Sequence, residues 1–215
     1  MTKKLLAALA VSALVTGGAF AQVQLSAGGG FVFDGGRTSG MSMDAVDVSA
    51  HETRLGFGGF AFLDATFAEL SVGFMGGPMS YTATGLGVSY TEDGFSFTAL
   101  DFTLLGRFPI AVGGGNITVA PLLGIGYNLV LGATYEGNDV FEGSDDSASD
   151  LSNFRILLGV GADFDINDNL FFRAQALGRY SFANSMTRDE VSGVDGLNAT
   201  GGFGATIRLS VGFRF

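Results

Sequence analysis

The sequence contains no cysteine and no tryptophan, and only three prolines among its 215 residues. Without cysteine the chain cannot be a disulfide scaffold, so its fold must depend on hydrogen bonds and packing. Thirty-five glycines together with so little proline fit a curved β-sheet better than a disordered linker, because proline cannot donate to a β-ladder.

Basic residues are also scarce. The only lysines are Lys3 and Lys4, so nine arginines face 21 acidic residues in the rest of the chain. Such an excess of negative charge excludes nucleic acid as a partner, because binding a phosphate backbone requires lysine and arginine to neutralise it.

Apolar runs of about 18 residues, as a membrane-spanning helix requires, are missing after residue 21. Residues 1–21 have the features of a secretory signal peptide: the basic pair Lys3 and Lys4, an apolar run from Leu5 to Val15, and an A-x-A cleavage site at 19–21. The run is short for a retained anchor. We therefore predict that residues 1–21 are removed and that residues 22–215 form one exported domain.

Strict alternation marks the last ten residues. The apolar set is Ile207, Leu209, Val211, Phe213 and Phe215, and the polar or small set is Thr206, Arg208, Ser210, Gly212 and Arg214. A period of two places the two sets on opposite faces of a β-strand. Such a strand needs a sheet to pair with and an apolar medium on one side.

Seven further segments alternate in the same way. With the last one, the eight predicted strands are approximately Val23–Phe33, His51–Phe62, Phe67–Met75, Phe95–Phe108, Ile117–Leu131, Phe154–Phe164, Leu170–Phe182 and Thr200–Phe215. The phase of the pattern changes near Gly58–Gly59 and near Thr98–Ala99, which predicts β-bulges there. Pro121 lies inside the fifth segment, where we expect a bulge or a local break.

The connections between these segments alternate in length. Those after the second, fourth and sixth are short, whereas four long polar ones cover approximately residues 34–50, 76–94, 134–152 and 183–199. The long connections hold fourteen acidic residues and two arginines. This pattern predicts an all-β fold, an up-and-down antiparallel β-barrel of eight strands with its excess negative charge at one end.

Charges within the strands fall on the face opposite the apolar residues. We predict a charge network in the interior of the barrel from Arg54, Glu69, Asp101, Arg107, Arg155, Asp163, Arg173, Arg179, Arg208 and Arg214. Opposite charges in a lumen as narrow as that of an eight-stranded barrel need partners. Inward glycines such as Gly28 and Gly212 leave room for the long side chains.

Periodicity alone does not say which face points outward, but the apolar face resembles a lipid-facing surface. Aromatic residues gather near both strand ends, as the two interfaces of a bilayer favour. At the short-turn end they are Phe62, Phe67, Phe108, Phe164, Phe172, Phe213 and Phe215, and at the long-loop end Phe31, Phe33, Phe74, Phe95, Phe154, Tyr180 and Phe182. We therefore predict a transmembrane barrel.

Taken together, the cleavage site, the alternation of short and long connections and the final Gly212–Phe215 resemble small eight-stranded outer-membrane proteins of the OmpA, OmpX and OmpW kind. The resemblance implies that Phe213 and Phe215 form the signal that the barrel-assembly machinery reads. It also implies a bacterial outer-membrane location, with periplasmic short turns and extracellular acidic loops. We expect no peptidoglycan-binding domain after Phe215.

Candidate chemistry is sparse. His51 is the only histidine, and catalysis there would need a nucleophile such as Ser49, Ser80 or Ser89 within hydrogen-bond reach. The acidic stretch 136–150 lacks the ligand spacing of a calcium loop. We therefore expect no catalytic residue, no metal site and no cofactor.

Three functions are compatible with this pattern. We favour a monomeric structural or surface-interaction protein with a plugged lumen, whose partners are outer-membrane lipid, the assembly machinery and an unidentified extracellular partner of the four acidic loops. The alternative is a narrow channel for small or hydrophobic solutes, as in the OmpW-like comparison. The third is a lipid-modifying outer-membrane enzyme that uses His51.

Overall fold

A computed structural model describes residues 24–43, 48–112, 115–142, 147–192 and 197–215. The predicted signal peptide, residues 1–21, lies outside these ranges. Within them the chain forms ten strands and two short helices. The strands are β1 (Leu25–Met43), β2 (Val48–Ala65), β3 (Ala68–Gly85), β4 (Val88–Arg107), β5 (Ile110–Val112), β6 (Ile117–Tyr135), β7 (Asn138–Asp139), β8 (Asn153–Asp165), β9 (Leu170–Ser181) and β10 (Leu197–Arg214). The helices are the 3-10 helix η3 (Ala148–Leu151) and α2 (Ser185–Val191).

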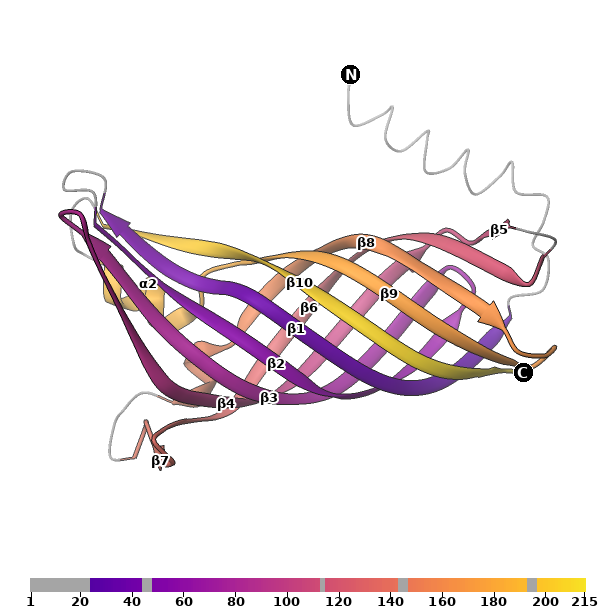
Figure 1. Cartoon of the computed structure of the whole chain (residues 1–215), viewed down its shortest axis with the longest axis horizontal. Coiled ribbons are helices and arrows are strands. Elements are labelled where there is room, and N and C mark those ends of the chain that lie inside the picture. Colours follow the sequence, from indigo (N-terminus) through magenta and orange to yellow (C-terminus); the bar gives the residue numbers. More distant parts are fainter. Residues whose placement is uncertain (1–23, 44–47, 113–114, 143–146, 193–196) are drawn as a thin grey trace, which may run out of the picture.

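All strand pairings are antiparallel, and eight strands pair in a ring. Neighbours along the chain pair from β1 to β4, β4 pairs with β6, and β6, β8, β9 and β10 follow in order. The last strand, β10, returns to β1 from Ser26↔Arg214 to Met43↔Leu197. The short strands β5 and β7 each pair with β6 only. Figure 1 shows these strands wound obliquely around the long axis, with α2 and β7 at one end and the C-terminus at the other.

The predicted all-β antiparallel fold is confirmed, whereas the described residues hold ten strands rather than eight. The predicted connections at 34–50 and 76–94 were wrong, because β1 continues to Met43 and the hairpin of β3 and β4 turns only at Leu86–Gly87. These stretches are rich in serine and threonine, which form cross-strand pairs such as Thr82–Thr91 and Thr84–Ser89, each 3.0 Å apart. A polar strand needs neither an apolar face nor burial when the neighbouring strands provide its backbone hydrogen bonds and cross-strand pairs.

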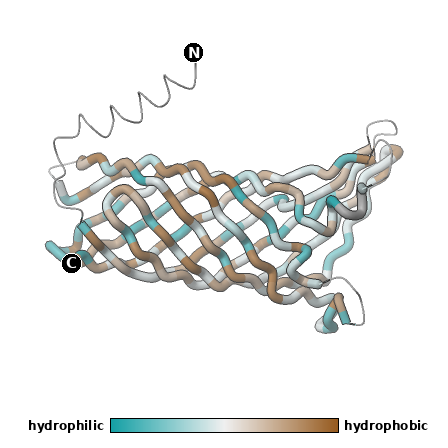
Figure 2. The backbone as a smooth tube through the Cα atoms, turned by 180° about the vertical axis from the view of Figure 1, so that it is seen from behind, coloured by the Kyte–Doolittle hydropathy of each residue, from teal (hydrophilic) through white to brown (hydrophobic). Residues whose placement is uncertain are grey.

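The outward faces of the ring are apolar. Side chains such as Leu55, Phe57 and Leu63 on β2 are more than 60 % exposed, and the same alternation runs along the other long strands. Figure 2 shows hydrophobic and hydrophilic residues alternating along the tube. The orientation predicted from the sequence is therefore confirmed for these residues. In the described ranges, no helix has the length and apolar character needed to cross a membrane.

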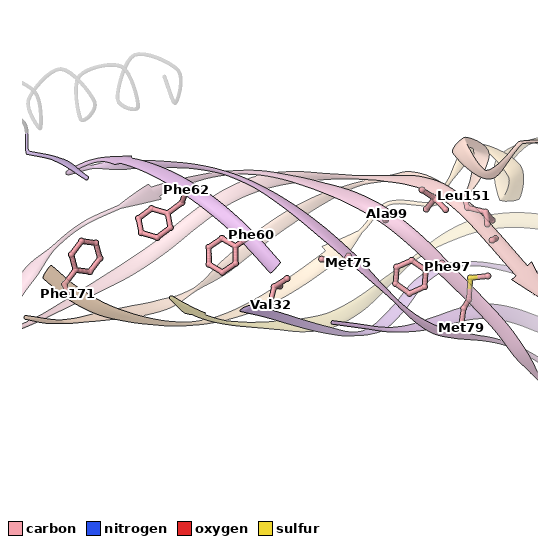
Figure 3. Packing of buried hydrophobic residues seen from close by; sticks show 11 residues of the cluster. Val32, Phe60, Phe62, Met75, Met79, Phe97, Ala99, Leu151 and Phe171 are labelled. Atoms are coloured by element: carbon pink, nitrogen blue, oxygen red, sulfur yellow. The ribbon is translucent and has the colours of Figure 1, made fainter. Parts of the chain in front are cut away.

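Apolar side chains also fill part of the interior. A cluster of buried residues extends along the axis from Phe171 and Phe62 to Met79 and Leu151 (Figure 3). A second cluster contains Leu105, Ala120, Leu122, Leu157 and Leu177. Two predicted girdle aromatics therefore have a different position: Phe62 is buried, and Phe95 packs against the first cluster.

One of the three predicted irregularities is absent, because the register of β2 runs without a shift through Gly58 and Gly59 on both sides. At Pro121 the register of β6 and β8 runs without a shift. On its other side β6 pairs with β5 up to Val119 and with β4 from Leu122, so the pairing is interrupted at Pro121. The pairing of β4 with β6 does shift between Thr98 and Ala99. The extra residue is Leu131 on β6, however, so the inward series on β4 continues unbroken through Phe97 and Ala99 to Asp101.

Small residues at the inner wall make room for rings. An added Cβ at Gly212 would lie 2.3 Å from the ring of Phe171, and one at Gly28 would lie 2.7 Å from the ring of Phe62. These separations are much shorter than a van der Waals contact. The two glycines on paired strands therefore allow two aromatic side chains to occupy the interior near the C-terminal end.

Candidate functional site

The most prominent polar feature is a set of ionised side chains inside the ring. Of the ten residues predicted to line the interior, nine are at most 4 % exposed. The tenth, Arg214, lies at the end of β10 and pairs with the partly exposed Asp165 at 2.6 Å. Alternation places these side chains inward, because each occupies the face opposite the exposed leucines and phenylalanines of its strand.

At the C-terminal end of the interior, two arginines share two carboxylates. Arg173 on β9 donates to Asp163 on β8 at 2.7 Å and lies 2.7 Å from Asp64 on β2. Arg107 on β4 donates to Asp163 at 2.9 Å and also contacts Asp64. Four strands therefore meet in one group of charges, which bridges the interior from wall to wall.

The middle of the interior is organised around Glu69 on β3, which is fully buried. Its Oε2 accepts hydrogen bonds from Arg173 at 2.8 Å and from Gln175 at 2.9 Å. Arg208 on β10 lies 3.7 Å from the other oxygen of Glu69 and donates to Asp101 on β4 at 3.2 Å. Arg208 therefore connects the carboxylates of two strands that lie across the ring from its own.

Further toward the end of the ring where α2 and β7 lie, which we call the outer end, Asp101 also pairs with Arg155 on β8. Arg155 lies 3.8 Å from Asp34 on β1, and Asp34 accepts a hydrogen bond from Arg179 at 3.0 Å. A separate pair, Glu52 with Arg54, lies beside them. Arg54 donates to the side chain of Asn128 at 3.1 Å and to the carbonyl of Leu151 in η3 at 2.9 Å.

Charge in the described part of this interior is balanced. Six buried arginines (Arg54, Arg107, Arg155, Arg173, Arg179 and Arg208) face six buried carboxylates (Asp34, Glu52, Asp64, Glu69, Asp101 and Asp163). Buried ions are costly without partners, and here each has at least one of opposite sign. Ten of the twelve form one continuous series of ion pairs from Arg179 to Arg107.

Three of these carboxylates were missing from the sequence prediction. Asp34 was assigned to a loop, but it continues the inward positions of β1 one step beyond Phe33. Glu52 and Asp64 share the phase of Arg54 on β2. Extending the alternation past the last large apolar residue would have found all three, since the strands continue beyond their apolar stretches.

Aromatic rings lie under several of the guanidinium groups. The guanidinium carbon of Arg173 is 4.8 Å from the ring centres of both Phe62 and Phe171, and that of Arg208 is 5.2 Å from Phe60. Arginine stacks favourably on aromatic faces, and more so where water is excluded. The rings thus separate the ion pairs and fill the space between them.

Three separate cavities lie along the described interior. The largest, about 310 Å³, is at the outer mouth and is lined by apolar residues of the walls and by η3 and α2, including Met79, Phe95, Phe141, Leu151 and Met186. A cavity of about 110 Å³ lies at the C-terminal end beside Arg107 and Arg214. Between them, a cavity of only about 10 Å³ lies among Arg54, Arg155 and Arg179, about the space of one water molecule.

His51 borders the cavity at the outer mouth. Partial burial lowers the pKa of the His51 imidazole below its ordinary 6.5, and the positive charge of Arg37 lowers it further. In the described part of the chain, none of the proposed nucleophiles Ser49, Ser80 and Ser89 makes a hydrogen bond to this ring. That the protein is not an enzyme stays a prediction, which replacement of His51 by glutamine would test.

The acidic stretch 136–150 is described except for residues 143–146. Where the chain is described, no group of three acidic or histidine side chains is close enough to hold a metal ion. At the other end, Phe213 and Phe215 are exposed, with ring centres 5.6 Å apart, and the backbone N–H of Phe215 donates to the carbonyl of Leu25. Their role as an assembly signal remains a prediction.

Solved structures that the chain resembles include outer-membrane β-barrel proteins. The outer membrane protein OprG from Pseudomonas aeruginosa is 14% identical, with 89% of this chain and 95% of that chain covered and a TM-score of 0.48. The outer membrane protease OmpT from Escherichia coli is 9% identical, with 92% and 98% covered and a TM-score of 0.45.

The attachment invasion locus protein Ail of Yersinia pestis is 17% identical, with 87% of this chain and 99% of that chain covered and a TM-score of 0.34. No family model and no curated protein matches the sequence. The function therefore has to be inferred from the residues of this chain.

Proposed function

We propose that the ring of eight strands is a transmembrane β-barrel of the bacterial outer membrane, with a plugged lumen and a structural or surface-interaction role. Its acidic outer end faces the outside of the cell, and its short turns face the periplasm. Residues 1–21 direct export and are removed.

The observation that carries this proposal is the exchange of polar and apolar faces. Twelve balanced ionised groups are buried inside the ring, while leucine, phenylalanine, valine and isoleucine cover its outside. A water-soluble barrel would have the opposite arrangement, since large exposed apolar surfaces drive association in water. In a bilayer the same surface is matched by lipid tails.

The height of the apolar surface agrees with this interpretation. Outward apolar residues extend over nine residues on β2, from Leu55 to Leu63, and over nine on β6, from Leu123 to Leu131. On β8 they extend over eleven residues, from Phe154 to Phe164. A tilted strand crosses the hydrocarbon core with roughly 9–11 residues. The polar parts of β1 to β4 then extend beyond the membrane at the outer end.

Three features support a plugged lumen. The ion pairs join opposite walls, and aromatic rings lie between them. The cavity that lies between the two larger ones has a volume of only about 10 Å³. Moving an ion through this region would require separating buried pairs, which costs several kcal/mol for each unpaired ion.

Planar-bilayer recordings of the refolded mature chain test the plug. We expect insertion without a steady conductance, and the double variant Glu69→Gln/Asp101→Asn, which removes two interior carboxylates, serves to show that currents can be detected once the interior pairs are broken. A reproducible open pore in the unmodified protein would contradict the plugged lumen and favour transport.

The cavity at the outer mouth favours a second candidate, uptake of small hydrophobic solutes. Its lining is mainly methionine, aromatic and aliphatic side chains, and its volume of about 310 Å³ suits a small molecule. Saturable binding of a hydrophobic fluorophore, lost in Met79→Glu and kept in the outward-facing variant Leu55→Glu, would support this candidate. If the fluorophore also crossed vesicle membranes that contain the protein, the role would be transport.

A further inference from the structure

One side of the outer extension has an unpaired strand edge. Along β4, pairing with β3 continues to the turn, where Val88 lies opposite Gly85. Pairing with β6 begins only at Phe95↔Tyr135. Residues 88–93 therefore have no described partner on the side away from β3. We refer to these six residues as the β4 edge, which at about 3.3 Å per residue is roughly 20 Å long.

The edge stays open because β6 turns away at this level. After Tyr135 the chain enters a turn in which Glu136 and Gly137 both have positive φ, and β7 folds back onto β6 itself. The last contact with β4 is the hydrogen bond from the N–H of Glu136 to the carbonyl of Gly94. Figure 1 shows β1 to β4 extending together at this end of the molecule.

Only some of the features that usually protect a strand edge are present here. Charged side chains, proline, short length and β-bulges discourage edge-to-edge pairing. The six residues include Glu92 and Asp93, and the β3–β4 register shifts between Met79 and Tyr81 at their base, but they contain neither lysine nor proline. Val88 and Tyr90 are 70% and 65% exposed. Their side chains share one face of the strand with Glu92, by alternation. A strand that added here would find backbone hydrogen-bonding groups, an apolar surface and a carboxylate in a row.

The charge around this edge is negative. Glu92 and Asp93 belong to it, and Glu136 follows directly after the neighbouring Tyr135. The nearby carboxylates, Glu136 first and then Glu92, raise the pKa of the exposed Tyr135 hydroxyl. An approaching segment with lysine or arginine would be attracted, whereas one with acidic side chains would be repelled.

We propose that the β4 edge is a docking site for an extended basic peptide segment of another protein, which adds to the sheet as a further strand. Backbone hydrogen bonds supply the affinity, and alternate side chains supply the specificity. A β-branched or apolar residue faces Val88 and Tyr90, and a lysine or arginine lies opposite Glu92. The proposal rests on the proposed function, because it requires this end of the barrel to be outside the cell.

Two other occupants fit less well. A second copy of the chain would bring another Glu92 and Asp93 to the same edge, and the chain already carries a net charge of −10. Lipid would leave the backbone groups of the edge without hydrogen bonds, which is costly in a hydrocarbon environment. The charge and the backbone groups together select an extended cationic peptide.

Amide hydrogen exchange on the refolded mature chain in micelles tests the site. The probe is a capped eight-residue peptide that alternates lysine with valine and threonine. We expect it to slow exchange at residues 88–93, and not at the paired residues of β10. The same peptide with glutamate in place of lysine, and a version N-methylated along one edge, should give no protection. Protection by either control peptide, or none by the probe, would overturn the proposal.

Matched variants locate the charge effect. Glu92→Gln removes a carboxylate from the edge, and Glu142→Gln removes one from the same end of the molecule but outside it. We expect Glu92→Gln to weaken binding of the labelled peptide roughly two- to fivefold, the range of an exposed ion pair. Glu142→Gln should leave binding unchanged, and equal weakening by the two variants would contradict docking at the edge.

Two further outcomes separate this inference from the proposed function. If residues 88–93 become protected without peptide as protein concentration rises, and sedimentation shows a dimer, the occupant is a second copy and the basic-peptide proposal fails. If the chain does not insert into bilayers at all, the membrane proposal fails. A chain that inserts normally and binds no peptide contradicts only the docking site.

Discussion

Individual buried ions in this protein depend on partners from distant strands. Glu69 illustrates the dependence, because Arg173, Arg208 and Gln175 all approach it, and none of them lies on its own strand. Removing one partner of a buried pair leaves the other ion without compensation, which is more costly than replacing both. The stability of the barrel should therefore respond strongly to single changes at such positions.

Glu69→Ala is the direct test. We expect it to lower the free energy of unfolding in lipid vesicles by roughly 3–5 kcal/mol, because Gln175 and Arg208 lose an acceptor or an ion partner. Asp165→Ala is the matched control, since its pair with Arg214 is partly exposed and should contribute less than about 1 kcal/mol. Urea titrations of both variants provide the comparison, and similar small losses would show that the interior pairs contribute little.

The single histidine predicts how stability depends on pH. The pKa of folded His51 is below its ordinary 6.5, so below that pH the unfolded chain binds protons more readily than the folded one. The contribution of His51 to the free energy of unfolding is therefore complete above pH 6.5, and it decreases as the pH falls toward the pKa of the folded state. The measurement is the free energy of unfolding of the unmodified protein minus that of His51→Gln, from about pH 7.5 to 5.5. A stabilisation of the unmodified protein relative to His51→Gln that grew as the pH fell would contradict this sign.

At the scale of single elements, the hairpin of β3 and β4 turns through two residues in the left-handed region. Leu86 has φ +51° and Gly87 has φ +78°. A two-residue turn of this kind suits asparagine or glycine and penalises a leucine. Leu86 is also 88% exposed, so it contributes no packing that would offset the penalty.

Leu86→Asn should therefore stabilise the tip of this hairpin by about 1 kcal/mol, whereas Gly87→Ala should destabilise it. An added Cβ at Gly87 would meet no atom within 4 Å, so only the backbone conformation opposes the alanine. Amide exchange of residues 82–91 gives the readout. If both variants changed exchange in the same direction, the left-handed turn would not control the stability of the tip.

The elements show where sequence reasoning succeeds and where it does not. Alternation such as that of Ile207 to Phe215 correctly predicted the exposed faces, because each large apolar residue there contacts the surroundings. Phe60 and Phe62 were interpreted as a change of phase, since the interior was assumed to be polar. They instead stack against Arg208 and Arg173, because a guanidinium also interacts favourably with the face of an aromatic ring.

The ends and partners of the strands were harder to predict. Residues 37–43 and 80–85 have few apolar side chains, so periodicity gives no signal for the outer extension of β1 to β3, although the neighbouring strands supply its ladder. The ion pairs cross the interior between strands that are distant in sequence, such as Arg173 with Glu69. Charge balance could be inferred from composition, but which arginine meets which carboxylate depends on the stagger of the strands.

At the scale of the whole molecule, the two ends of the barrel should be accessible from different compartments. Because the chain has no cysteine, single cysteines at Leu86 in the outer hairpin and at Ile166 in a short turn can report orientation. On intact cells an impermeant maleimide should label Leu86→Cys, and it should label Ile166→Cys only after the outer membrane is permeabilised. Labelling with the opposite preference would mean that the orientation is reversed.

The cross-wall ion pairs also affect how the barrel can form. Arg155 on β8 meets Asp101 on β4, Arg208 on β10 meets Asp101 and Glu69, and Arg179 on β9 meets Asp34 on β1. A sheet that had assembled only its first four strands would therefore expose Asp34, Glu69 and Asp101 without their arginines. Such an intermediate is poorly tolerated in hydrocarbon, so closure of the last seam between β1 and β10 and neutralisation of the centre should happen together, in a single cooperative step.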